Sequence, residues 1–191
     1  MTRIACTLPL SREQAASLTA GDWASLSGVL YTARDAAHKR FENLLDRGEP
    51  LPFPIEGACV YYAGPAPAKD GQVIGSVGPT TSGRMDVYTP RLLELGLRCM
   101  IGKGDRSEAV ITAMKKAGAV YFAAPGGAGA LLASRVTCAE TAAFPDLGPE
   151  AVIRLTVRDF PALVAIDSKG GNLYTLGPAN YFTLLQAGCK T

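Results

Sequence analysis

The sequence has 191 residues, of which 48% are hydrophobic and 19% are charged. A chain of this length can bury one proper core, so we expect a single domain over residues 1–191. The 19 basic and 17 acidic residues give a net charge of only +2. A balance this even, without a run of lysine or arginine, excludes the basic stripe that nucleic-acid-binding proteins carry.

The first ten residues lack the apolar stretch of a secretory signal. The longest apolar stretch, Ala117–Ala133, is interrupted by Pro125 and four glycines, so it does not predict a membrane span. We therefore expect a cytoplasmic protein.

Five cysteines are widely spaced, at positions 6, 59, 99, 138 and 189. Their odd number and the lack of a Cys-x-x-Cys pair favour free thiols. Apolar neighbours around Cys59, Cys99 and Cys138 predict buried side chains. The single histidine, His38, cannot join a local metal motif. We therefore expect no metal or iron–sulfur site held by this chain alone.

Short β-rich runs and helical patterns alternate along the chain, which predicts an α/β domain with a mixed sheet. The expected strands are Arg3–Leu8, Gly28–Tyr31, Ala58–Ala63, Gln72–Val77, Arg98–Ile101, Ala119–Ala123, Ala151–Val157 and Ala162–Asp167. The first expected helix is Ala33–Asp46, which a capping box of Thr32 and Asp35 begins. A second has Thr89 as its N-cap and ends at Gly96. A third begins at the capping box of Asp105 and Glu108 and ends at Gly118, and a short fourth helix follows Gly126–Gly129.

The loop Gly78–Asp86 has the sequence Gly-Pro-Thr-Thr-Ser-Gly-Arg-Met-Asp and follows an expected strand. It gathers Thr80, Thr81, Ser82 and Arg84 within five positions. Hydroxyls and loop amides can bind an anion, and Arg84 can grip a carboxylate with two parallel hydrogen bonds. The alternative is a polar surface turn.

Two further cations stand beside expected element ends. Arg34 lies in the first turn of a helix, where the macrodipole disfavours a cation. Either Asp35 compensates, or Arg34 and the helix N-terminus face an anion together. Lys103, between Gly102 and Gly104, resembles the end of a phosphate-binding loop, but the glycine spacing and Gly104 break that motif. Lys103 can still reach an anion; a solvated loop lysine is the alternative.

The segment Gly126–Gly129 is an incomplete dinucleotide fingerprint, because Leu132 holds the place of the third glycine. Tight turning and close packing is the better interpretation. His38 is more often a structural histidine than a catalyst. We can assign neither a complete nucleophile–base set nor a pair of catalytic carboxylates. The cations Arg34, Arg84 and Lys103 form half of an anion site, which a second chain would complete.

Five motifs occur in an order that resembles one family: Thr32-Ala-Arg34-Asp35-Ala-Ala-His38-Lys-Arg40, Tyr62-Ala-Gly64-Pro65, Gly78–Asp86, Gly102-Lys103-Gly104 and Asp159-Phe160-Pro161. Over about Thr7 to Tyr174 the chain resembles the β subunit, or C-terminal domain, of class I iron–sulfur fumarate hydratases and the related L-tartrate dehydratases.

The resemblance implies a three-layer swivelling β/β/α domain. It implies a partner α subunit that carries a [4Fe-4S] cluster on its own cysteines, in a hetero-oligomer of α2β2 type. It implies Thr80 as the base, and Arg34, Arg84 and Lys103 as ligands of the substrate carboxylates. The open iron of the partner's cluster would hold the hydroxyl that leaves or adds, as a Lewis acid.

Two segments look more like fumarases: residues 82–86 followed by Tyr88-Thr-Pro90, and Gly104-Asp-Arg-Ser107 after Lys103. Tartrate dehydratase β subunits tend to carry a bulkier residue at the Gly83 place. The resemblance therefore favours a hydro-lyase that interconverts malate and fumarate, with L-tartrate dehydratase as the alternative. A hypothesis of another class is a stand-alone small-anion binding module without catalysis. A nucleotide-binding protein that uses Gly126–Gly129 is a third hypothesis.

Overall fold

Seven strands pair into one mixed sheet in the computed structural model, which describes residues 3–188, with only the backbone at 180 and 183–188. The strands are β1 (Ile4–Leu8), β2 (Trp23–Thr32), β3 (Cys59–Tyr61), β4 (Cys99–Gly102), β5 (Val120–Ala123), β6 (Val136–Ala143) and β7 (Val152–Ile166). The helices are α1 (Arg12–Ser17), α2 (Asp35–Asp46), α3 (Thr89–Glu94), α4 (Glu108–Ala117), α5 (Gly129–Ala133) and α6 (Leu173–Gly188), with 3-10 turns η1 (Ser82–Met85) and η2 (Pro145–Glu150).

The sheet closes on itself. The strands β2, β3, β4 and β5 are parallel neighbours, and β7 pairs antiparallel with both β5 and β2. The inside of this ring is an apolar core to which β1, β2 and β7 contribute from one wall and β3, β4 and β5 from the other. The alternation of side chains along a strand sends Tyr61 inward and Tyr62 outward.

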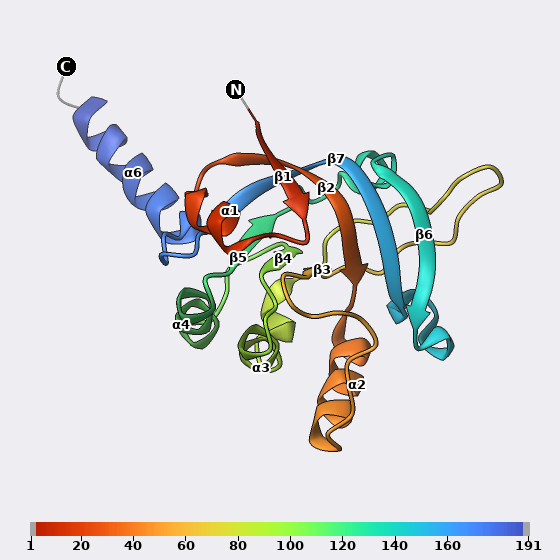
Figure 1. Ribbon diagram of the computed structural model, residues 1–191. Helices are drawn as coiled ribbons and strands as arrows, with labels where there is room; N and C mark the ends of the chain where they lie inside the picture. The colour runs from red at the N-terminus through yellow and green to blue at the C-terminus, as the bar shows by residue number, and fades with distance from the viewer. Residues whose placement is uncertain (1–2, 189–191) are drawn as a thin grey trace.

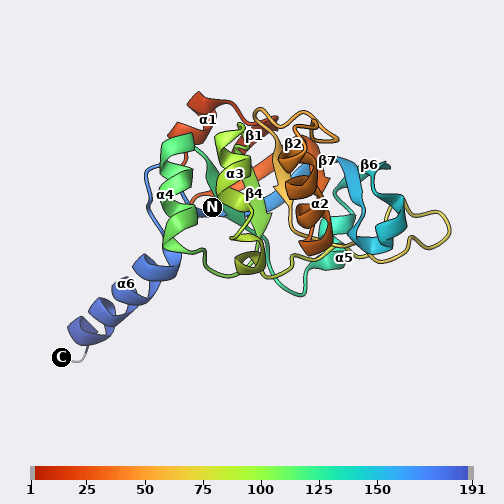
Figure 2. The same ribbon diagram turned by 90° about the horizontal axis from the view of Figure 1, so that it is seen from below.

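A second core covers the outer face of β3, β4 and β5, against α2, α3 and α4. Figure 1 shows these helices on the side of the sheet away from β1 and β2, and Figure 2 shows them side by side from below. Their inward residues follow helical spacing, with Ala37, His38 and Phe41 buried on α2 and Val110, Ile111 and Met114 buried on α4. The molecule thus has one apolar core inside the ring of strands and a second between the ring and the helices.

The α/β class, the mixed sheet and most expected elements are confirmed, but several details are wrong. The runs Ala151–Val157 and Ala162–Asp167 are one strand, β7, which continues through Asp159 at φ 52°. The stretch Gln72–Val77 is loop. The sequence patterns also missed β6, α1 and α6. No described helix is both long and apolar enough to cross a membrane.

The expected stop of α4 at Gly118 is confirmed, but the expected N-caps are wrong, since Tyr88 and not Thr89 is the N-cap of α3. The N-cap of α2 is Arg34, and the Thr32 hydroxyl instead donates to the carbonyl of Ala151 and accepts from the amide of Ile153. The N-cap of α4 is Ser107 rather than Asp105. The local pattern assigned Thr32 to a helix cap, but in the fold its hydroxyl binds the backbone at the start of β7.

Candidate functional site

The loops that follow the parallel strands meet at one edge of the sheet. Arg34 follows β2, Lys103 follows β4, and the loop Gly78–Asp86 lies between β3 and α3. Because the carboxyl ends of parallel strands share an edge, these segments become neighbours. The structure brings Thr80 and Arg84 into side-chain contact and places Lys103 beside their loop through its backbone. Arg34 is linked to them through its neighbour Asp35, which pairs with Arg84.

Thr80 and Arg84 are in direct contact. Arg84 Nη2 donates a hydrogen bond to Thr80 Oγ1 over 2.8 Å, at a partly solvent-exposed position. The 3-10 turn Ser82–Met85 folds the loop back by four residues and makes this contact possible. The Thr80 amide donates to the carbonyl of Tyr62 over 2.7 Å, which ties the loop to the end of β3.

Arg84 also faces the first turn of α2, where its Nη2 lies 3.3 Å from Asp35 Oδ2. About half of the Arg84 side chain is exposed, at 47%. Arg84 therefore joins the loop Gly78–Asp86 to α2, and its exposed guanidinium retains N–H groups for a ligand.

Arg34 is the N-cap of α2 rather than a residue of its first turn, and an anion of the chain itself lies beside it and the helix N-terminus. The anion is the carboxylate of Glu150, which lies 3.4 Å from Arg34 Nη2 and accepts from the Ala36 amide at 3.0 Å. A Cβ on Gly64 would lie 3.0 Å from Arg34 Nη1, so this glycine makes room for the arginine.

Lys103 lies beside the same loop through its backbone. Its amide donates to the carbonyl of Thr80 at 3.3 Å, and its carbonyl accepts from the amide of Ser82 at 2.9 Å. The residue is exposed to solvent, directly after the end of β4. A lysine there can add a point charge to the two guanidinium forks.

His38 is a structural residue of α2. Its ring is fully buried against Phe41, Tyr62 and Tyr88. Its Nδ1 donates to the carbonyl of Arg34 over 2.8 Å. Burial lowers the pKa of His38 to about 4, so the ring is neutral at neutral pH.

The described residues do not fit an iron–sulfur cluster or a metal ion. Residues 3–188 contain no group of three or more possible His, Cys, Asp or Glu ligands. Cys6, Cys59 and Cys99 are buried in the apolar core, and burial raises the pKa of the Cys99 thiol well above its ordinary value. The four described cysteines are free thiols, although Cys138 is only half-buried; Cys189 lies outside the described residues.

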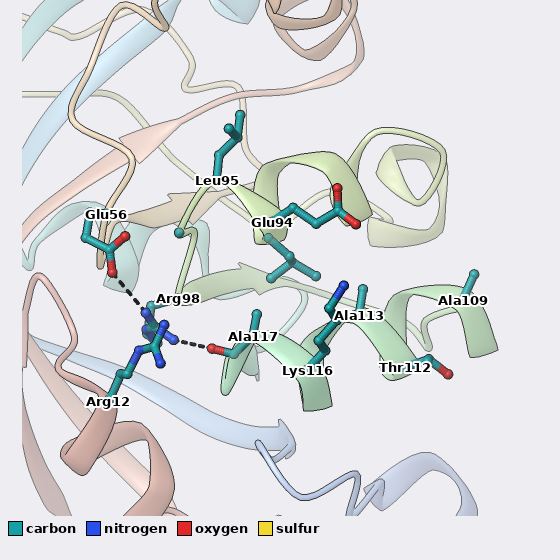
Figure 3. A pocket seen from close by; sticks show the side chains of 12 residues that line it. Arg12, Glu56, Glu94, Leu95, Arg98, Ala109, Thr112, Ala113, Lys116 and Ala117 are labelled. Carbon is teal, nitrogen blue, oxygen red and sulfur yellow. Dashed lines mark hydrogen bonds and ion pairs between the residues drawn. The ribbon is translucent and has the colours of Figure 1, made fainter.

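A cavity of about 690 Å³ lies at the opposite edge, before β3, β4 and β5 begin. Figure 3 shows Arg98 between Glu56 and the end of α4. Arg98 Nη2 lies 3.0 Å from Glu56 Oε1, and its Nη1 donates to the carbonyl of Ala117. Its charge is therefore already paired with Glu56 and with the C-terminal end of α4. This cavity is not the candidate site.

Three residues at the edge were missed from the sequence. Asp86 forms an ion pair with the buried Arg106, and Glu150 pairs with Arg34. Asp86 closes the loop motif, which is a local signal. Arg106 and Glu150 carry no local signal, because their partners come from distant parts of the chain.

The fold and the site define an α/β domain whose loops gather Arg34, Arg84 and Lys103 at one edge of the sheet. The family described as Fumarase C-terminus matches residues 1–177. The chain is 42% identical over 169 residues to fumarate hydratase 2 of Leishmania major, covering 86% of this chain and 29% of that protein. It is 43% identical over 155 residues to the aerobic class I fumarate hydratase of Salmonella typhimurium, covering 78% and 26%.

A shorter relative matches over most of its length. The putative L(+)-tartrate dehydratase subunit beta of Methanocaldococcus jannaschii is 40% identical over 171 residues, which is 86% of this chain and 88% of that protein. The chain therefore spans less than a third of the fumarate hydratases above, but nearly all of this subunit. It belongs to the Fumarase C-terminus family, and its named homologues are hydro-lyases.

Proposed function

We propose that this chain is the β subunit of a class I hydro-lyase that interconverts malate with fumarate and water. In this proposal the chain supplies the residues that bind the substrate carboxylates and the hydroxyl that moves a proton. The contact between Arg84 Nη2 and Thr80 Oγ1 at 2.8 Å is the observation that carries the proposal. We also assign the two walls of the strand ring and the helices α2, α3 and α4 to the three layers of the swivelling β/β/α fold.

A threonine hydroxyl is a weak base unless its environment favours the deprotonated form. A guanidinium that donates to the oxygen stabilises negative charge on it, and Arg84 is placed to do so. Removal of a proton next to a carboxylate builds negative charge on that carboxylate in the transition state. Cations already in place stabilise this charge without reorganisation.

Arg34, Arg84 and Lys103 would bind the substrate carboxylates. Each arginine already faces a carboxylate of the chain itself, Glu150 for Arg34 and Asp35 for Arg84. Both pairs are partly exposed and longer than 3.2 Å, so a bidentate substrate carboxylate can compete for them.

In this proposal the site is incomplete, since the Thr80 hydroxyl needs an acidic group to pass its proton on and this chain assigns none. We propose that a partner α subunit closes this edge, holds the [4Fe-4S] cluster and contributes the missing acid, in an α2β2 assembly. The short match to whole fumarate hydratases and the long match to a subunit named beta support a separate chain with this role.

Fumarate is favoured over tartrate at Gly83. This residue is exposed, and a Cβ on it would meet only the carbonyl of Asp105, at 4.0 Å. A bulkier residue, as tartrate dehydratases tend to carry, would therefore fit at this position. The glycine is thus not required by packing, and its presence matches the fumarases.

The test is reconstitution of the chain with its cluster-bearing partner, followed by fumarate absorbance with malate and, separately, by oxaloacetate formation from L-tartrate. We expect turnover of malate and at most slow turnover of tartrate. Faster turnover of tartrate would transfer the assignment to L-tartrate dehydratase. Tight binding of dicarboxylates by the isolated chain in calorimetry, with no turnover after reconstitution, would favour the anion-binding module.

A further inference from the structure

Arg106 is a fully buried guanidinium behind the site, with 0% of its side chain exposed. Its Nε donates to Asp86 Oδ1 over 2.7 Å and its Nη2 donates to Thr89 Oγ1 over 2.9 Å. Asp86 ends the loop that carries Thr80 and Arg84, and Thr89 begins α3. The planar guanidinium therefore binds both the end of the loop Gly78–Asp86 and the start of α3.

Two tyrosine rings enclose the same guanidinium. Arg106 Cζ lies 5.2 Å from the ring centre of Tyr62 and 5.1 Å from that of Tyr121. Tyr62 accepts the amide of Thr80 through its backbone carbonyl, and the Tyr121 hydroxyl donates to the carbonyl of Gly104 over 2.8 Å. Arg106 thus packs against residues that contact both the Thr80 loop and the Lys103 loop.

The carboxylate of Asp86 completes the connection between these loops. Its Oδ2 accepts from the backbone amide of Ser107 over 2.7 Å, while its Oδ1 holds Arg106. The Lys103 loop runs directly into this segment. Thr80 and Lys103 are thus connected directly by backbone hydrogen bonds between their loops, and indirectly by the largely buried Asp86–Arg106 ion pair.

Stability alone is a weak reason for such a pair. Burying both charges carries a desolvation cost that apolar side chains of similar volume avoid, and such replacements are often neutral for stability. The pair does, however, define geometry: a guanidinium fork bonds to two oxygens at set angles, which an apolar contact or a lysine cannot do.

We propose that Arg106 is a positioning residue of the hydro-lyase reaction, which sets Thr80 and Arg84 at the correct distance from Lys103. The proposal rests on the proposed function of the site. Since an error of about 1 Å in such an arrangement can cost about 100-fold in rate, Arg106 should act on turnover much more than on substrate binding.

The main test is Arg106→Lys, measured in the reconstituted complex. This variant keeps the charge opposite Asp86 but loses the bond to Thr89 and the stacking on the tyrosines. We expect kcat to fall about 30-fold or more and KM to change by less than about five-fold, since the carboxylate ligands remain. Amide hydrogen exchange at Ser82 and Lys103 should quicken, while amides of β7 keep their protection.

Two comparisons separate positioning from a general effect on stability. Leu26→Ala creates a cavity in the other core, and its kcat per folded complex should equal that of the wild type. The double variant Asp86→Leu/Arg106→Met removes both charges together, so it should keep the melting temperature but show the same loss of kcat.

The outcomes are distinct. An inactive wild-type complex would contradict the proposed function itself. With an active wild type, an unchanged kcat in Arg106→Lys overturns the positioning role. A loss of kcat without faster exchange at Ser82 and Lys103 overturns it too, because Arg106 would then not act through the loops.

Discussion

Arg84 and Thr80 are four residues apart in one loop, and the guanidinium of the first donates to the hydroxyl of the second over 2.8 Å. The same guanidinium lies 3.3 Å from Asp35 on α2. This relationship links a charge that can bind a carboxylate to a hydroxyl that can move a proton.

Replacing Thr80 by valine removes the hydroxyl and keeps the shape of the side chain. If Thr80 is the base, kcat should fall by about 100- to 10,000-fold, the usual contribution of general acid–base catalysis. KM should change little, because the cations are untouched. Thr80→Ser, which keeps the hydroxyl, should retain much of the activity; steady-state kinetics on the reconstituted complex measures both.

Arg84→Lys keeps a positive charge but cannot contact Thr80 and a carboxylate with one planar group. We expect kcat/KM to fall about 100-fold, as for the loss of a preorganised donor. The melting temperature should hardly change, since the side chain is half-exposed. Arg91→Lys, in an ion pair away from the site, is the matched control and should behave as the wild type.

Asp35→Asn removes the carboxylate that competes for Arg84. Because exposed ion pairs contribute about 0.2–1 kcal/mol, we expect KM for the dicarboxylate to fall by about two- to five-fold. Asp46→Asn breaks an ion pair with Arg91 at the far end of the same helix and should leave KM unchanged. A rise of KM in Asp35→Asn would show that Asp35 supports the site instead.

The lowered pKa of His38 leads us to expect that the folded chain loses stability in acid. Its pKa is lowered to about 4 in the folded chain, first because of burial, and is about 6.5 when unfolded. Below pH 6.5 only the unfolded state binds this proton, so the free energy of unfolding falls by up to about 1.4 kcal/mol per pH unit down to pH 4. Above pH 6.5 the ring contributes no slope.

Urea denaturation between pH 7 and 4 measures this slope in the wild type and in His38→Phe. The variant keeps an aromatic ring among aromatic neighbours, and the carbonyl of Arg34 still accepts the backbone amide of residue 38. Its slope should be smaller by about one proton. Equal slopes in both proteins would mean that His38 is protonated in the folded state.

Gly102 has no space for a side chain, since a Cβ would lie 1.9 Å from Ser82 Oγ. Gly102→Ala should therefore destabilise the fold by about 1–3 kcal/mol, as overpacking does, and should lower kcat because both loops move. Adding Ser82→Ala removes the clashing hydroxyl, so it should restore part of the stability. Chemical denaturation of the single and double variants gives the comparison.

The sequence predicted the mixed sheet, α2 and α4, because hydrophobic periodicity is a local property; the roles of Thr80, Arg34, Arg84 and Lys103 stay predictions. Local patterns could not show that β7 continues through Asp159, since the pairing with β2 and β5 keeps it extended. They also could not show Glu150 beside Arg34 or Arg106 beside Asp86, because those contacts arise only when the chain folds. The resemblance supplied the role of Thr80; composition alone indicated only a polar loop.

The central claim is that this chain supplies half of a shared catalytic site. The most direct measurement is a titration of the cluster-bearing partner with this chain while fumarate absorbance is followed. We predict no turnover from either chain alone, activity that saturates at one chain per partner, and inhibition by excess Thr80→Val, which should assemble without catalysis. Full turnover by the partner without this chain would contradict the account.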